Sequence, residues 1–251
     1  MNICIVNIHE NNPYIGGVER VSFELGHDWI KKGHNVFFLS QYKSTIKKSY
    51  LSLCKELFLP NSDKADAMVN VEYCIALLKK YNIDIILNQG GIYPGLCELI
   101  RLIKSNTEIK VVTSIHCAPL CKITDIDNSF FIKEKLGKSI RKWLIDIGLY
   151  MRYVLYKKQL LLNAEKNDLK RISTFSETIV CLSPSFLVTF QELLGNPDTT
   201  QLIAIPNPIK RIDKPLMLKK QKSIIYVGRL EFGLKRIDRL IKIWAKTEHL
   251  F

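Results

Sequence analysis

The sequence predicts an α/β fold in which a parallel sheet is covered by helices on both faces and is followed by the first strand and helix of a second sheet domain. Two observations lead to this prediction. Apolar runs of strand length alternate with amphipathic stretches through the first 205 residues, and one further strand (223–230) and helix (237–246) stand just before Phe251. A lone strand and helix cannot bury their apolar faces, so this pair indicates the start of a second domain.

The elements of the first domain follow from their patterns in chain order. Residues 3–8 are almost entirely apolar, which is typical of a strand buried on both faces. Val18, Val21, Leu25 and Trp29 then form one stripe of a helix that ends at residues 31–33. Further strands are expected at 35–40, 83–87, 110–115, 178–182 and 202–205, and helices at 65–80, from Pro94 onward and at 184–194.

Two stretches depart from this alternation. Residues 118–137 lack periodicity, so we expect a loop or an irregular insertion there. Residues 138–170 are helical in pattern and rich in basic and aromatic side chains, which suits either contact with an anionic membrane or a long packed helix with solvated lysines; the second interpretation is favoured. Prolines and basic residues then indicate a linker, which divides the chain into domains at 1–205 and 223–251 joined by 206–222.

The composition and the net charge indicate which kinds of partner the protein binds. The chain has 251 residues, of which 47% are apolar, and a net charge of +13 at pH 7. This charge favours anionic partners, namely nucleic acid, an acidic membrane surface or nucleotide diphosphates. The sequence has no nucleic-acid-binding motif, so specific nucleic-acid binding is the weakest of the three.

The sequence also predicts where the protein is located and whether it binds zinc. No signal peptide precedes the first strand, and residues 143–162 carry too many charges to span a bilayer, so we expect a cytoplasmic protein. The seven cysteines suit reduced thiols. His116, Cys117 and Cys121 lack a second ligand pair, so no zinc site is predicted.

Candidate binding residues follow the predicted strands. Ligands of parallel sheets bind beyond the carboxyl ends of the strands, where this sequence has Gly16, Gly17, the run from Asn88 to Gly91, His116 and Ser183. A glycine pair before a helix lets a ligand approach the backbone, and the helix N-terminus attracts an anion. The sequence lacks the Gly-x-Gly-x-x-Gly pattern and an acidic residue after its second strand, which argues against a nicotinamide cofactor.

Several motifs together resemble glycosyltransferase family 4, whose members have the GT-B fold of two Rossmann-like domains. Gly-Gly-Val-Glu-Arg (16–20) is similar to the opening loop of that family, and Val-Gly-Arg-Leu (227–230), Lys235 and Asp-Arg-Leu (238–240) are similar to its second-domain entry. Cys-Leu-Ser (181–183) and Ile-Pro-Asn (205–207) also match, except that Pro208 replaces the usual glycine. The resemblance covers essentially the whole chain.

The resemblance implies retaining transfer of a sugar from a nucleotide diphosphate sugar to a glycan or lipid-linked acceptor, without a metal ion. Arg229, Lys235, Gly16 and Gly17 would bind the donor diphosphate, and the fixed charge of the arginine and the lysine would stabilise the leaving group. His116 would face the donor sugar, where it either bonds a hydroxyl or senses charge. The remaining candidates are possible rim contacts: Glu19, which could instead cap its helix, Asn88 and Ser183.

The family's Glu-x7-Glu motif, base-binding segment and final helix would come after Phe251, so we expect little transfer by this chain alone. Two alternatives therefore stay open. The chain could be a non-catalytic acceptor- or membrane-docking half that needs a separate donor-binding chain. A GT-B nucleotide-sugar epimerase ranks third, because the glycine and arginine motifs look more like family 4.

Overall fold

The computed structural model describes residues 1–44, 53–124, 140–195, 201–208, 225–226 and 237–247. Most of the predicted linker (209–222) and most of the strand expected at 223–230 lie outside these residues, as do Arg229 and Lys235. The chain divides into two compact units, one of Met1–Leu120 with Leu155–Pro208 and one of Cys121–Val154 with Ile209–Phe251. The first unit contains the whole sheet, and the proposed division at 205 and 223 stays a prediction.

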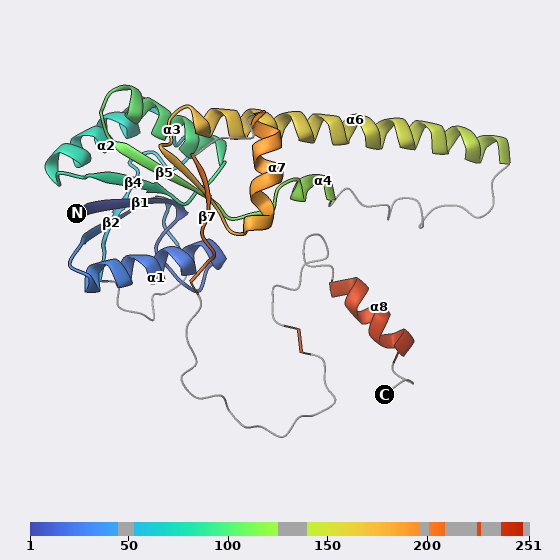
Figure 1. The fold of residues 1–251 in the computed structure, drawn as a ribbon, viewed down its shortest axis with the longest axis horizontal. Helices are drawn as coiled ribbons and strands as arrows, with labels where there is room; N and C mark the ends of the chain where they lie inside the picture. Colours follow the sequence, from blue (N-terminus) through green and yellow to red (C-terminus); the bar gives the residue numbers. More distant parts are fainter. Residues whose placement is uncertain (45–52, 125–139, 196–200, 209–224, 227–236, 248–251) are drawn as a thin grey trace, which may run out of the picture. The chain divides into compact units, whose positions relative to one another are not determined.

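The sheet has seven strands in the order β3-β2-β1-β4-β5-β6-β7, and each neighbouring pair is parallel (Figure 1). This confirms the predicted fold class. The strands are β1 (Asn2–His9), β2 (Asn35–Tyr42), β3 (Lys55–Phe58), β4 (Ile85–Asn88), β5 (Lys110–Ile115), β6 (Thr178–Cys181) and β7 (Leu202–Ala204).

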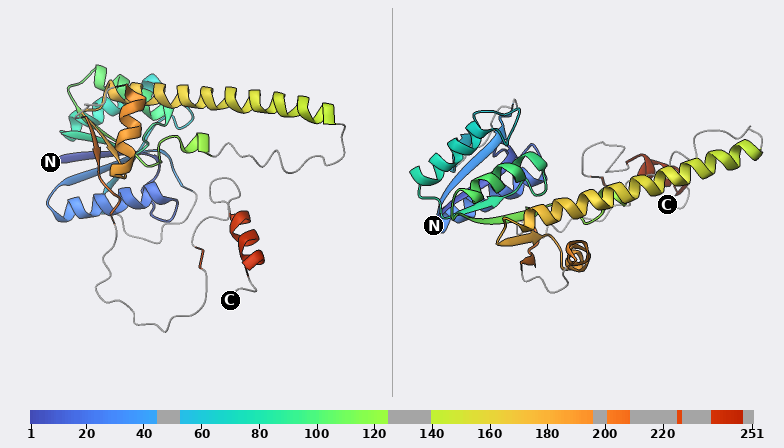
Figure 2. Two further views of the ribbon diagram at one scale, coloured as in Figure 1. Left: turned by 45° about the vertical axis from the view of Figure 1, so that its right-hand side comes forward. Right: turned by 90° about the horizontal axis from the view of Figure 1, so that it is seen from above.

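Helices cover both faces of this sheet (Figure 2). One face carries α2 (Met68–Lys80), α3 (Pro94–Ser105), α7 (Pro184–Leu194) and the C-terminal part of α6 (Ile140–Ser173), and the other carries α1 (Gly17–Lys31). The second unit contains the short α4 (Cys121–Thr124), the first part of α6, and α8 (Ile237–Thr247).

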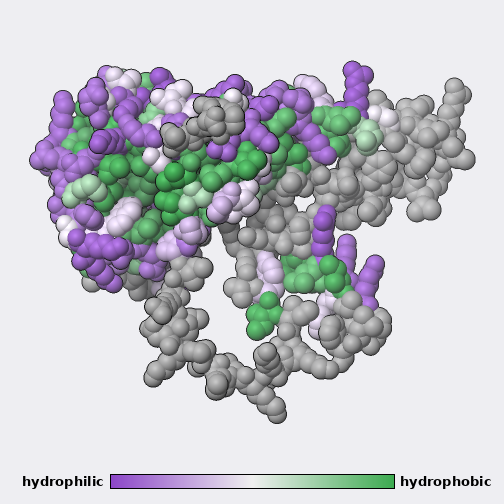
Figure 3. Space-filling model, viewed as in Figure 1, coloured by the Kyte–Doolittle hydropathy of each residue, from purple (hydrophilic) through white to green (hydrophobic). Residues whose placement is uncertain are grey.

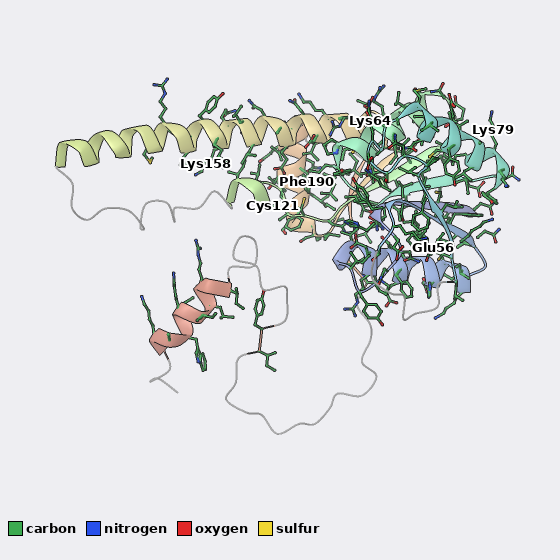
Figure 4. All side chains as sticks on the ribbon, turned by 180° about the vertical axis from the view of Figure 1, so that it is seen from behind. Glu56, Lys64, Lys79, Cys121, Lys158 and Phe190 are labelled. Atoms are coloured by element: carbon green, nitrogen blue, oxygen red, sulfur yellow. The ribbon has the colours of Figure 1, made fainter. Side chains whose placement is uncertain are left out.

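Two apolar cores lie on the two faces. Cys4 and Val6 of β1 point into the larger core, where Phe190 of α7 is 1% exposed (Figure 4). Ile3 and Ile5 point to the opposite side, toward α1. A strand that is apolar at successive positions therefore packs on both faces, as its sequence predicts.

The sequence prediction was incomplete at several elements. β3 was not predicted, and α2 begins at Met68 instead of residue 65. Asn70 explains the later start of α2, because its side-chain amide donates to the carbonyls of Asn61, Lys64 and Ala65 and holds them in a turn. Within residues 118–124 the expected irregular stretch contains α4. None of the helices within the described residues is long and apolar enough to span a membrane.

Candidate functional site

The predicted site residues of the first domain all follow strand ends. Because every strand pair is parallel, these ends lie along one edge of the sheet, which we call the carboxyl edge. Asn88 is the last residue of β4, His116 follows β5, and Ser183 lies two residues after β6. The structure brings Asn88 and His116 to one place, whereas Gly16 and Ser183 each lie at the start of a helix.

Glu19 lies at the N-terminus of α1. Its side chain is 7% exposed, and a Cβ atom added to Gly16 would collide with Glu19 Oε2. A Cβ atom added to Gly17 would meet nothing within 4 Å. The backbone of Gly16 is extended, with φ of −165°, so a larger residue at position 16 would displace the Glu19 carboxylate without straining the backbone. A carboxylate at a helix N-terminus is favourable.

Ser183 forms the N-cap of α7. Its Oγ accepts a hydrogen bond from the backbone N–H of Ser185 at 3.3 Å, and Pro184 occupies the first helical position. This geometry starts a helix without any ligand. The structure therefore gives Ser183 a local structural role.

Asn88 fixes the turn that follows β4. Its side chain is fully buried, and its Nδ2 donates to the carbonyl of Gly91 at 3.0 Å and to Thr113 Oγ1 at 3.4 Å. Gly91 has φ of +58°, and a Cβ atom there would lie 3.0 Å from the carbonyl oxygen of Ser114. The turn is thus fastened closely to the end of β5.

His116 is bonded to Gln89, the first residue after β4. The imidazole Nε2 and Gln89 Oε1 form a short hydrogen bond. Burial lowers the pKa of His116 to about 4, so its imidazole is neutral at physiological pH. A neutral ring at this position donates and accepts hydrogen bonds but carries no charge.

Buried polar atoms gather at the carboxyl edge. Within the described residues, hydrogen-bond partners are missing for Asn7 Nδ2, both carboxylate oxygens of Glu10, Asn12 Nδ2, Gln41 Oε1 and Asn88 Oδ1. These residues lie at or just beyond the ends of β1, β2 and β4. Sequence reasoning did not select Glu10, Asn12 or Gln41, although each is a polar residue at or close behind the end of a buried apolar run.

An apolar groove of about 360 Å³ leads along the α1 face of the sheet to this edge. Its polar end is formed by Gln89, Ser114 and His116. Apolar side chains form its walls, among them Ile3, Leu25, Trp29, Leu87, Val112 and Val180. Figure 3 shows apolar side chains at the surface of the sheet domain, between α1 and the helices of the other layer.

The described residues offer little for metal binding. No three His, Cys, Asp or Glu side chains in this part of the chain lie close enough together to hold an ion. Amide groups, the carboxylates of Glu10 and Glu19, and the neutral imidazole of His116 are the polar groups present at the carboxyl edge.

Comparison with known proteins identifies the family. The sequence profile described as Glycosyltransferase Family 4 matches residues 15–211, whereas no curated protein matches the chain. The lipopolysaccharide outer core galactosyltransferase WaaB, in its apo form, is 15% identical with a TM-score of 0.57; the match covers 96% of this chain and 57% of that one. Sucrose-phosphate synthase from Thermosynechococcus elongatus is 13% identical with a TM-score of 0.52, covering 82% and 48%.

The chain therefore spans about half the length of these two structures. At such low identities, the structural matches show the fold alone, which is one Rossmann-like domain of the GT-B type. The family profile covers most of the chain, including the Gly16–Arg20 motif and every strand after β1. The chain belongs to glycosyltransferase family 4.

Proposed function

We propose that this chain is the acceptor-side part of a retaining glycosyltransferase that transfers a sugar from a nucleotide diphosphate sugar to a glycan or lipid-linked acceptor. Family membership supports a nucleotide-sugar donor and an acceptor. WaaB, which shares the fold, is named as a galactosyltransferase of the lipopolysaccharide outer core. An acceptor of that general kind, a glycan on a lipid, is proposed here by analogy.

The unpartnered polar atoms at the carboxyl edge are the observation that carries this proposal. Four of them accept hydrogen bonds (Glu10 Oε1 and Oε2, Gln41 Oε1 and Asn88 Oδ1), and two donate (Asn7 Nδ2 and Asn12 Nδ2). Leaving a buried polar atom unbonded costs about 1–3 kcal/mol. Sugar hydroxyls both donate and accept, so they suit this mixture, whereas a phosphate only accepts and would be repelled by Glu10.

The diphosphate of the donor is assigned to Arg229 and Lys235. The planar guanidinium of Arg229 suits two phosphate oxygens at once, and Lys235 adds a compact charge. The carboxylate of Glu19 lies beside Gly16, so the surroundings of Gly16 add negative charge and cannot balance a phosphate. Arg229 and Lys235 would therefore supply most of the positive charge that balances the diphosphate. Gly16 and Gly17 would admit the diphosphate close to the backbone. Charge compensation of this kind needs no metal ion.

Nucleotide binding tests the donor site. Replacing Arg229 or Lys235 with alanine should weaken the binding of a nucleotide diphosphate by about 1.5–3 kcal/mol, roughly 10- to 150-fold, because each substitution removes a charged hydrogen bond. The double variant should lose less than the sum, since both cations serve one ligand. Calorimetry with UDP and GDP would measure these affinities.

Lys242→Ala is the matched control, because it removes one positive charge from an exposed position on α8. Arg229→Lys should restore binding only in part, since the planar fork is lost. Undiminished nucleotide affinity in the Arg229→Ala, Lys235→Ala double variant would contradict the assignment.

We also propose peripheral contact with an anionic membrane on the cytoplasmic side, through a surface of α6. Leu155, Tyr156 and Leu160 are 61%, 65% and 50% exposed. Lys157 and Lys158 lie among them and are exposed too. Exposed apolar side chains beside lysines suit the interface of an acidic bilayer. Such contact would bring a lipid-linked acceptor to the carboxyl edge.

A further inference from the structure

Gln89 is held in place by both neighbouring strands. Its backbone N–H donates to the carbonyl of Val6 in β1 at 2.9 Å, so the ladder between β1 and β4 continues past the end of β4. On the other side, Asn88 bonds to Gly91 and Thr113, and Gly91 packs on the carbonyl of Ser114. Gln89 itself is 2% exposed. Its side chain therefore starts from a backbone position with little freedom.

The hydrogen bond between Gln89 and His116 determines which imidazole nitrogen carries the proton. The side-chain carbonyl oxygen of Gln89 can only accept, so Nε2 of His116 must donate to it. A neutral imidazole has one N–H, which leaves a lone pair on Nδ1. Within the described residues Nδ1 forms no hydrogen bond, and His116 lines the polar end of the groove.

We propose that Gln89 is the positioning residue of His116: by accepting the Nε2 proton, it makes Nδ1 a fixed acceptor for a hydroxyl group of the bound sugar. This assignment rests on the proposed function for the identity of the ligand, but the role of Gln89 in setting the tautomer does not. A phosphate oxygen has no proton to give to Nδ1, so the ligand class is a hydroxyl donor.

The fixed tautomer of His116 restricts which ligands can form a hydrogen bond with its Nδ1. A histidine free to exchange its proton between the two nitrogens would present either a donor or an acceptor, so it would accept ligands with either polarity. With Nε2 held by Gln89, a sugar must place a hydroxyl hydrogen at Nδ1 to bind well. A site built to bond a hydroxyl discriminates strongly against analogues that lack it.

The ¹⁵N NMR spectrum of the imidazole rings tests the tautomer in the full chain without any ligand. His116 should show a protonated Nε2 and an unprotonated Nδ1 from neutral pH down to mildly acidic pH. His27 is the internal comparison among the five histidines, because its Nε2 accepts from the backbone N–H of Leu53 at 3.3 Å and it should show the opposite tautomer. A protonated Nδ1 on neutral His116 would overturn the proposal.

Two substitutions test whether Gln89 fixes the tautomer of His116 or only fills space beside it. Gln89→Glu keeps an acceptor for Nε2 but adds a negative charge, so the midpoint of the His116 titration should rise by about one pH unit or more. Gln89→Met fills similar space without an acceptor, so a signal from the Nδ1–H tautomer should appear. An unchanged His116 signal in both variants, with the remaining spectrum intact, would show that Gln89 only fills space.

Titration with UDP-glucose, UDP-galactose and GDP-mannose then tests the ligand. If a probe binds, the Nδ1 signal of His116 should shift while Nε2 stays protonated, and the shift should be lost with the corresponding nucleotide lacking the sugar. Binding that leaves Nδ1 unmoved would overturn the acceptor role. Absence of binding by all nucleotide sugars would count against the proposed function, whereas the tautomer measurements would still decide the role of Gln89.

Discussion

Gly16 and Gly17 are adjacent, yet the structure distinguishes them. We expect Gly16→Ala to push the Glu19 carboxylate away from the N-terminus of α1, because the new methyl group and Glu19 Oε2 would occupy the same space. Losing the favourable interaction with the helix dipole should lower the free energy of unfolding by about 0.3–1 kcal/mol. Urea denaturation measures this change.

Gly17→Ala is the matched control, since nothing lies within 4 Å of its added Cβ. It should leave stability unchanged or raise it slightly, because alanine favours the helix. Equal loss of stability in both variants would mean that Glu19 has no special place beside Gly16.

His116 makes stability depend on pH. Its pKa is about 4 when folded and near 6.5 when unfolded, so between these values the unfolded chain binds more protons. Stability is therefore full above pH 6.5 and declines as pH falls toward 4. Between pH 7.5 and 5, His116 should account for a loss of about 2 kcal/mol.

Comparison with His116→Gln isolates this contribution, because the carboxyl groups titrate in both proteins. Urea denaturation of each protein at pH 7.5, 6 and 5 should show a steeper decline for the wild type. Parallel declines would contradict a buried neutral imidazole.

At the scale of single residues, the sequence predicted which residues lie at the ends of strands but not which side chains contact one another. Asn88 and His116 were selected because they follow strands, and the structure places both at the carboxyl edge. Gln89 was placed at this edge together with Asn88, but its contact with His116 was missed because that contact depends on β4 and β5 being neighbours in the sheet. The buried carboxylate of Glu10 was missed as well, since a Glu-Asn-Asn run looks like an ordinary polar turn.

At the scale of turns and helices, the turn after β4 requires glycine at position 91 for two reasons. Gly91 has φ of +58° and lies against the carbonyl of Ser114, so Gly91→Ala should lower stability by about 1–2 kcal/mol for the conformation and further for the contact. Gly33→Ala provides the control: φ there is +85°, but nothing lies within 4 Å of the added Cβ. The expected order of stability by urea denaturation is wild type, Gly33→Ala, Gly91→Ala.

Gly91→Ala and Gly33→Ala also test whether the turn after β4 holds His116 in place. Gly91→Ala should also move the imidazole signals of His116, whereas Gly33→Ala should not. If the two variants proved equally stable, the close packing of Gly91 on β5 would be wrong.

The strands predicted in the first domain have observed bounds within two residues of the predicted ones, and two elements match to the residue. β5 and α7 have the predicted bounds, 110–115 and 184–194, because each is framed by clear boundary signals such as Pro184. β3 was missed because Lys55–Phe58 is a short edge strand whose side chains are at most half-buried. Such a strand has no continuous apolar run, and its pairing with β2 comes from tertiary structure.

At the scale of the whole molecule, the α/β class and the family were predictable because they depend on alternation and on several motifs together. The second domain is different, since Arg229 and Lys235 lie outside the described residues. The donor-side contacts therefore rest on the resemblance and on phosphate chemistry, and the nucleotide-binding experiment tests them.

The proposed membrane contact is also tested on the whole molecule. The chain should float with vesicles that contain phosphatidylglycerol, and Lys157→Ala with Lys158→Ala should weaken this binding roughly 10- to 30-fold at about 1 kcal/mol per lysine. Lys79→Ala with Lys80→Ala removes the same charge from α2 and should have little effect; Lys79 and Lys158 are marked in Figure 4. Equal flotation with uncharged vesicles would contradict an electrostatic contact.

The parallel pairing of β1 also governs how the chain can assemble during synthesis. Ile3 pairs with Val36 of β2 on one side and with Ile85 of β4 on the other, and no tight hairpin can join such strands. Translation adds about 5–20 residues per second, so the second partner is made seconds after the first. Until then, one side of an apolar strand stays unpaired, and open apolar edges invite aggregation. β1, which lies inside the finished sheet between β2 and β4, thus begins as an edge strand, and its second side stays open until β4 has been made.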